Sequence, residues 1–494
     1  MRRFSRVVLV VFGLLLGTTG SAQPPAEKPS EETVEAVATG IRDSGFKLFS
    51  TLYELSLLRA EAGGEQQLTI SPMSIAEAMT LLSLGAEKQT LDELAALFIA
   101  PNSGIKDPAE SLSLSVREIR SQLADFAKHS GDTFEYTSAN AIIINTSSLE
   151  QVKLNADYRK KAAAYYDAQV FPYAFDQNAL ATVNNWVEEK TKGRVKKLIE
   201  NLDSNTLSLL INATYTKGKF AKHFNRMSEG TYTTAKGKKV PAFFLTKNEE
   251  MGYAKSSGLE IFSFKVQAND SVPNVERDQI ALDILVPSGA SLEGTIAGLT
   301  GRRYAAFVKL LAPTDVELTI AAGKLEPQKA FQLGDVFQTP DYSVRRAFDS
   351  DLAEFDPLGR LSNGAAFHIS EVRTKSFYEV TPFGFEAAAG TAIATARGGF
   401  MSNAAVKRTV DGPSIHVVRH IPTGTPLMIS VYDFPKNYTE EELAKLVAEG
   451  SGSGRQLNVK TAKGYIHSTW HEGKRSVVLE DENRKVLKVF NTAN

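Results

Sequence analysis

Helical periodicity dominates the first part of the chain. From Thr33 to Leu58, apolar residues recur at intervals of three and four, the spacing that gives an α-helix one apolar face. Ser71-Pro72 predicts the start of a second helix, because serine is a favoured N-cap residue and proline is favoured in the first turn. Gly85 is expected to end this helix. A third helix is predicted from Val183 to Leu198.

Strand patterns become frequent further along the chain. They are short apolar or alternating segments bounded by polar residues and glycine. Strands are predicted at Thr137–Asn145, Leu207–Thr216, Gln279–Val286 and Ala305–Ile320. Because helices cluster early and strands late, this order favours a mixed α+β domain over repeating βαβ units.

The N-terminus has the pattern of a secretory signal peptide. Three arginines within the first six residues precede the apolar run Val7–Leu16, and small residues follow up to Ser21-Ala22. This apolar run is too short to span a bilayer core of about 30 Å. We therefore expect a signal peptide over residues 1–22, a flexible Pro/Glu-rich leader over residues 23–32, and a secreted protein, either extracellular or in a bacterial periplasm, without a membrane anchor.

Composition removes several classes of function. The 56 Lys and Arg residues balance 57 Asp and Glu residues, so no general attraction to nucleic acid or anionic lipid is expected. The absence of cysteine excludes disulfides, cysteine nucleophiles and thiolate metal sites. There is no G-x-S-x-G motif, and His471-Glu472 lacks the second histidine of a zinc-binding helix. The sequence therefore predicts no enzyme, no cofactor and no metal.

One segment differs from the rest of the chain. From Phe383 to Met401 it contains mostly small residues, and no proline occurs between Phe383 and Thr409. A flexible surface loop or a short alanine-rich helix would each fit this composition.

Seven motifs, in order along the chain, resemble segments of the serpin family, the serine protease inhibitors. They are Leu68–Ile75 with Leu82–Gly85, Ala139-Asn140, Val183–Val187 with Thr191–Val195, Leu210–Ala213 with Lys217–Phe220, Ala347–Asp349 with Glu354–Asp356, Gly384–Thr391, and Arg419–Gly424. The resemblance extends from about Gly45 to Pro435. It implies an α+β serpin fold with three β-sheets, eight to nine helices and an exposed reactive-centre loop.

The same resemblance implies a function. A serpin is a suicide substrate: a target serine protease cleaves the loop and forms an acyl-enzyme, and the freed loop inserts as a strand into the main sheet and traps the protease. We therefore expect a monomeric inhibitor with a serpin domain at residues 33–437. Residues 438–494 form an added extension of unknown role, predicted as a helix, a flexible link at residues 450–454 and a hairpin.

The resemblance also assigns site residues. Ser71, Ser74 and Asn212 match the polar cluster beneath the point where the main sheet opens. The loop hinge corresponds to Gly384, Phe385, Glu386, Ala387, Ala388, Ala389, Gly390 and Thr391. The candidates for the scissile bond are Arg397, Gly398, Phe400 and Met401. Arg397 is favoured because a longer insert leaves slack, and it would attract a trypsin-like protease.

Several positions depart from the family pattern. Phe385 stands at the first inserting position, where inhibitory members usually carry a small residue, and Pro382-Phe383 stands where an acidic pair is common. Thr374 and Phe220 replace a usual histidine and tryptophan. A bulky first residue would slow insertion, so the alternative is a non-inhibitory serpin that acts as a protease substrate or binding protein.

Overall fold

The computed structural model describes most of the chain beyond the first 27 residues. The described residues are 28–59, 68–100, 103–131, 133–146, 152–176, 178–191, 193, 195, 197–202, 206–266, 279–325, 331–362, 366–376, 378–386, 405–433, 437–452, 457–471 and 474–490. The predicted signal peptide and the first part of the predicted leader lie outside them.

Nine α-helices precede residue 433 in the described part of the chain, within the range that the sequence predicts, and a tenth follows it. They are α2 (Glu31–Arg59), α3 (Pro72–Ser83), α4 (Lys88–Ala95), α5 (Pro108–Ser130), α6 (Ala156–Tyr166), α7 (Ala179–Lys190), α8 (Leu292–Ala297), α9 (Gly301–Val308), α10 (Gly334–Phe337) and α11 (Glu440–Gly452). The start of α3 is as predicted: Ser71 is its N-cap, and the Ser71 hydroxyl accepts a hydrogen bond from the Ser74 N–H at 3.3 Å.

Two predicted elements are wrong in part. The segment Ala305–Ile320 begins inside helix α9, because Thr300 caps that helix through the Arg303 N–H at 3.1 Å and Tyr304 and Phe307 bury one face. The strand starts only at Ala312. The helix predicted up to Leu198 ends at Lys190 instead.

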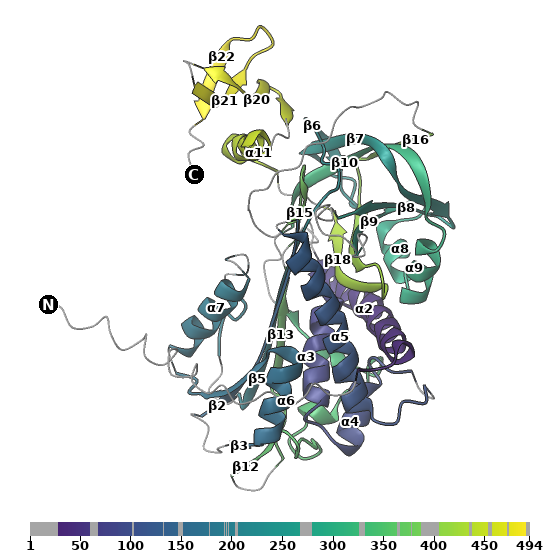
Figure 1. Cartoon of the computed structure of the whole chain (residues 1–494), viewed down its shortest axis with the longest axis vertical. Coiled ribbons are helices and arrows are strands. Elements are labelled where there is room, and N and C mark those ends of the chain that lie inside the picture. The colour runs from purple at the N-terminus through teal and green to yellow at the C-terminus, as the bar shows by residue number, and fades with distance from the viewer. Residues whose placement is uncertain are drawn as a thin grey trace, which may run out of the picture.

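The main sheet contains the candidate site. Its first strands are, in order, β4 (Gln169–Tyr173), β2 (Phe134–Asn145), β5 (Ser208–Lys219) and β13 (Glu371–Lys375). Strand β14 (Tyr378–Thr381) follows β13 along the chain. On the far side, β11 (Phe331–Gln332) pairs with β13, and the end of β10 (Ala312–Leu325) pairs with β14. Helices α3, α5 and α6 lie on one side of this sheet and α7 on the other (Figure 1).

Two further sheets share the long strand β7. The upper sheet consists of β6 (Arg226–Thr233), β7 (Lys239–Ser256), β10 and β16 (Val406–Val410). The rear sheet consists of β1 (Leu68–Ile70), β18 (Thr425–Tyr432), β17 (Ser414–His420), β9 (Ile280–Pro287), β8 (Leu259–Lys265) and the end of β7. A separate pair joins β3 (Val152–Leu154) to β12 (Gly359–Leu361). Since β10 also pairs with β14, the three main layers are continuous.

Residues 437–490, here called the C-terminal module, extend the upper sheet. The module contains α11, β19 (Asn458–Thr461), β20 (Gly464–His471), β21 (Lys474–Glu480) and β22 (Val486–Phe490), and β19 pairs in parallel with β6 (Figure 1). The helix continues to Gly452, into the segment where the sequence suggests a flexible link, and four strands follow it in place of one hairpin. None of the helices in the described residues is long and apolar enough to cross a membrane.

Candidate functional site

Strands β5 and β13 are direct neighbours in the lower part of the main sheet. Residues 209–213 pair in parallel with residues 371–375, and one of these pairs joins Asn212 to Thr374. Higher up, the short strand β15 (Gly384–Glu386) lies between β5 and β14, so that Phe385 pairs with Gly218 on one side and Val380 on the other. The upper ends of β5 and β14 with β15 between them are called the fork below.

Two glycines allow the hinge to enter the fork. A Cβ atom on Gly384 would lie 2.0 Å from the carbonyl oxygen of Gly218, so a side chain cannot fit there. A Cβ atom on Gly218 would lie 2.4 Å from the Phe385 ring, whose side chain is only 1% exposed. The bulk of Phe385 is therefore accommodated by the missing side chain of Gly218, and this ring is buried in the uncleaved chain.

The turn between β14 and β15 is held by backbone hydrogen bonds. The carbonyl of Pro382 accepts from the Phe224 N–H at 2.8 Å, and the carbonyl of Phe383 accepts from the Phe220 N–H at 2.9 Å. The Thr381 hydroxyl donates to the Gly384 carbonyl at 3.1 Å. Pro382-Phe383 thus forms the turn that directs the hinge into the fork.

An aromatic cage surrounds a buried lysine next to this turn. The Lys247 Nζ atom lies 5.3, 4.8 and 5.0 Å from the ring centres of Phe220, Phe224 and Phe264. Burial lowers the pKa of Lys247, whereas the adjacent Glu249 carboxylate opposes this shift. Because Nζ also donates to the Lys222 carbonyl at 2.5 Å, the cage fixes the segment that follows β5.

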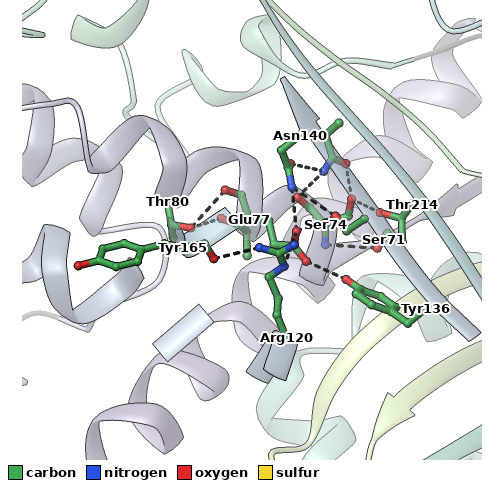
Figure 2. Close-up of polar contacts among 12 residues, drawn as sticks. Ser71, Ser74, Glu77, Thr80, Arg120, Tyr136, Asn140, Tyr165 and Thr214 are labelled. Atoms are coloured by element: carbon green, nitrogen blue, oxygen red, sulfur yellow. Dashed lines mark hydrogen bonds and ion pairs between the residues drawn. The ribbon is translucent and has the colours of Figure 1, made fainter. Parts of the chain in front are cut away.

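The structure brings Ser74 and Asn212 into direct contact, with Ser71 capping the same helix. The Ser74 hydroxyl donates to the Asn212 side-chain oxygen, and Asn212 Nδ2 donates to the Ser74 carbonyl at 2.9 Å. The Ser71 hydroxyl donates to the Leu427 carbonyl at 2.7 Å, which ties the cap to the rear sheet. Thr214 also donates to Ser74 (Figure 2). These side chains lie beneath β5, at the level where β5 and β13 are still paired.

A buried carboxylate that the sequence analysis missed completes this network. Glu77 is fully buried on α3 and accepts hydrogen bonds from Tyr136, Ser138 and Asn140 of β2 at 2.8, 2.6 and 2.8 Å (Figure 2). Arg120 of α5 lies 3.4 Å away and supplies a counter-charge. Asn140 is in turn bonded to Asn212 at 2.8 Å, so the network is continuous from α5 to β5. In the sequence, Glu77 stands out as the only charged residue between Pro72 and Ser83, one turn after Ser74.

The network has a clear electrostatic consequence. Burial, reinforced by the negative charge of Glu77, raises the pKa of Tyr136 well above its usual value, so its hydroxyl remains a donor. A buried charge is tolerated only when it is paired and hydrogen-bonded, and Glu77 has both kinds of partner. The cluster therefore fixes the position of β2 and β5 relative to α3.

The remaining predicted site residues lie outside the described residues. They are Ala387, Ala388, Ala389, Gly390, Thr391, Arg397, Gly398, Phe400 and Met401, and only the backbone of Glu386 is described. In the described part of the chain no three His, Asp or Glu side chains come close enough to hold a metal ion.

Comparison with known proteins identifies the family. The family model for serpins, described as serine protease inhibitors, matches residues 41–433. The bovine (Bos taurus) plasma serine protease inhibitor is 24% identical over 403 residues, covering 80% of this chain and 90% of its own. The chain therefore belongs to the serpin family, as its motifs indicate.

Solved structures agree on the fold. The native state of tengpin, a thermophilic serpin, superposes with a TM-score of 0.67 at 23% identity, covering 84% of this chain and 97% of its own. Thyroxine-binding globulin in complex with thyroxine gives a TM-score of 0.66 at 18% identity, covering 81% of this chain and 99% of its own. The predicted α+β serpin fold is confirmed.

The buried network gives a first testable prediction. Replacing Glu77→Gln removes the charge opposite Arg120 and places an amide donor against three existing donors, so we expect a loss of about 3 kcal/mol in the free energy of unfolding. Glu87→Gln removes an exposed ion pair with Lys88 and should cost much less, because solvent screens such pairs and they contribute little to stability. Urea unfolding of both variants measures the difference, and equal losses would contradict a structural role for the Glu77 network.

Proposed function

We propose that this protein inhibits a serine protease as a suicide substrate, through cleavage of the loop after β15 and its insertion into the main sheet. The observation that carries the proposal is the fork. Gly384 and Phe385, at the start of the proposed hinge, are already paired with both neighbouring strands, whereas Asn212 and Thr374 below them are still paired with each other. This is the arrangement of a sheet in which insertion has begun but has not proceeded.

The pairing of β15 fixes the register of further insertion. Phe385 pairs with Gly218 and Val380, and each further loop residue would descend one position on β5 and on the strand opposite. Thr391 would then arrive between Asn212 and Thr374, the pair that is now in contact. Thr395 would reach Ser208, the first residue of β5.

Small side chains suit both faces of such a strand. In this register Ala387, Ala389 and Thr391 would share the face of Phe385 and meet the Ser74 cluster, where space is limited and polar groups are present. Ala388, Gly390, Ala392 and Ala394 would meet the opposite face, where Leu209, Ile211 and Ala213 pack beneath α7. Since no proline interrupts the segment, every residue can donate to a ladder.

The energetic balance favours insertion. The nine residues 387–395 beyond β15 would form ladders on both sides, and at about 0.5–1.5 kcal/mol for each hydrogen bond the gain is on the order of 10 kcal/mol. Insertion would break the five residue pairs between β5 and β13, which are called the seam below. The departures at Phe385 and Pro382 do not oppose this balance, because Phe385 is already buried and Pro382 lies in the turn.

The end of the inserted segment favours Arg397 as the residue before the scissile bond. Insertion that stops at Thr395 leaves one residue, Ala396, before Arg397. Cleavage after Phe400 or Met401 would leave four or five residues of slack, and a trapped protease would be pulled less firmly. We therefore propose that a trypsin-like protease cleaves the loop at Arg397-Gly398. The inhibitor itself is proposed to be a secreted monomer that needs no cofactor and binds neither nucleic acid nor membrane.

The second candidate is a non-inhibitory serpin. The neighbour solved in complex with thyroxine is a chain of the same fold that binds a small molecule. A loop that is cleaved without trapping the protease would also fit the small residues of the segment. The two candidates differ in the fate of the protease.

Incubation with trypsin- and chymotrypsin-like proteases separates them. We expect a trypsin-like enzyme to form a complex that survives boiling in SDS, with a released peptide that begins at Gly398. Arg397→Ala should lose at least about 90% of this complex, because the cation that fills the specificity pocket is gone, whereas Met401→Ala should retain it. Complete cleavage with full protease activity remaining would contradict inhibition and favour the second candidate.

The register gives an independent prediction. Thr391→Glu would place a charge between Asn212 and Thr374, at a desolvation cost of several kcal/mol, so insertion should stall and the acyl-enzyme should hydrolyse. We expect the number of inhibitor molecules consumed per trapped protease to rise at least fivefold. Ser402→Glu, which lies after the proposed scissile bond, is the control and should leave this ratio unchanged. An unchanged ratio for Thr391→Glu would show that the register is wrong.

A further inference from the structure

Tyr438, the second described residue of the C-terminal module, reaches the fork. Its side chain is 7% exposed, and its hydroxyl lies 3.1 Å from the Glu379 Oε1 atom and 3.1 Å from the Val380 carbonyl oxygen. Both acceptors belong to β14, and these two residues pair with Glu386 and Phe385 of β15. One hydroxyl of the module therefore contacts the strand that pairs with the start of the predicted hinge.

The start of α11 fixes Tyr438 in place. Thr439 caps the helix, since its hydroxyl accepts from the Glu442 N–H at 3.2 Å, and the Glu442 carboxylate accepts from the Thr439 N–H at 2.9 Å. Tyr438 directly precedes this capping box, and Leu443, one turn into the helix, is buried. The tyrosine is thus oriented by two reciprocal hydrogen bonds as well as by its own burial.

The rest of the module is fastened to the upper sheet. β19 pairs with β6 over three residues, with Val459 fully buried opposite Met227. The Ala462 N–H donates to the Glu229 carboxylate at 2.8 Å. Apolar residues of the module, including Leu443 and Ile466, belong to the same continuous core as the serpin domain. The module therefore presents Tyr438 to β14 from a fixed support.

We propose that the C-terminal module positions the loop-insertion site: through the Tyr438 hydroxyl it holds β14 one strand away from β5 and so keeps the hinge docked in the fork. At the level of Phe385 the two strands must stand about 9.6 Å apart, twice the usual spacing, whereas they are neighbours at Thr374. A contact that fixes β14 at the wide end preserves this divergence. The consequence for inhibition rests on the proposed function, but the effect on the hinge does not.

Hydrogen exchange measured by mass spectrometry on the full chain tests this role. Tyr438→Phe keeps the ring and its packing but removes the hydroxyl. We expect the amides of residues 378–386 to exchange about three- to tenfold faster than in the unaltered protein, the range expected when one hydrogen bond is lost. Tyr465→Phe is the control, because it removes a hydroxyl from β20 of the module at a tyrosine that is 39% exposed. In this variant the amides of residues 378–386 should exchange at the same rate as in the unaltered protein.

The outcomes separate this inference from the proposed function. Unchanged exchange at residues 378–386 in Tyr438→Phe, or an equal increase throughout the main sheet, would overturn the positioning role even if a protease is trapped. Faster exchange confined to these residues supports it even if no protease is trapped. Where trapping does occur, Tyr438→Phe should also raise the number of inhibitor molecules consumed per trapped protease at least twofold. An unchanged number would show that the Tyr438 contact affects only the uncleaved protein, and would contradict a role in positioning the insertion site.

Discussion

The seam between β5 and β13 is the constraint on which the rest of the structure depends. It is a parallel ladder of five residue pairs at the centre of the main sheet, closed at Asn212 and Thr374 and opened above them by β15. Parallel pairing is slightly less stable per residue than antiparallel pairing. A loop that continues β15 would replace this one parallel seam with two antiparallel ladders. The intact molecule is therefore expected to store free energy in a connection that the cleaved loop can exchange for a better one.

Polar groups beneath the seam connect the strands on one side of it to the helices below. Ser74, Asn212 and Asn140 connect β5 and β2 to α3, and Glu77 extends this network to Arg120 on α5. A fully apolar contact would allow several alignments of the strands on the helix, whereas a satisfied polar network favours one alignment. Strands β2 and β5 are thus held to α3 and α5 as a unit, and the proposed insertion would have to separate β13 and β14 from them. The C-terminal module acts on that second part, because Tyr438 contacts β14.

Sequence reasoning anticipated what depends on local pattern and missed what depends on long-range pairing. The cap at Ser71 and the buried strands follow from local patterns, whereas the association of Ser74 with Asn212 was expected only from the resemblance to serpins. Val308 was assigned to a strand because a short helix followed closely by a strand has no single period. From the sequence, the bulk of Phe385 indicated slow insertion. The space beside Gly218 that accommodates its ring could not be foreseen, because it arises only when two segments far apart in sequence pair. Glu77 and Tyr438 were missed for the same reason: their partners lie on other elements.

Thermal unfolding of the intact and the loop-cleaved protein tests the central claim most directly. A non-target protease that nicks the chain between residues 396 and 402 would free the loop without trapping an enzyme. If the loop then replaces the parallel seam, a gain on the order of 10 kcal/mol should raise the melting temperature by at least about 10 °C. A cleaved protein that melts at or below the temperature of the intact one would contradict the account.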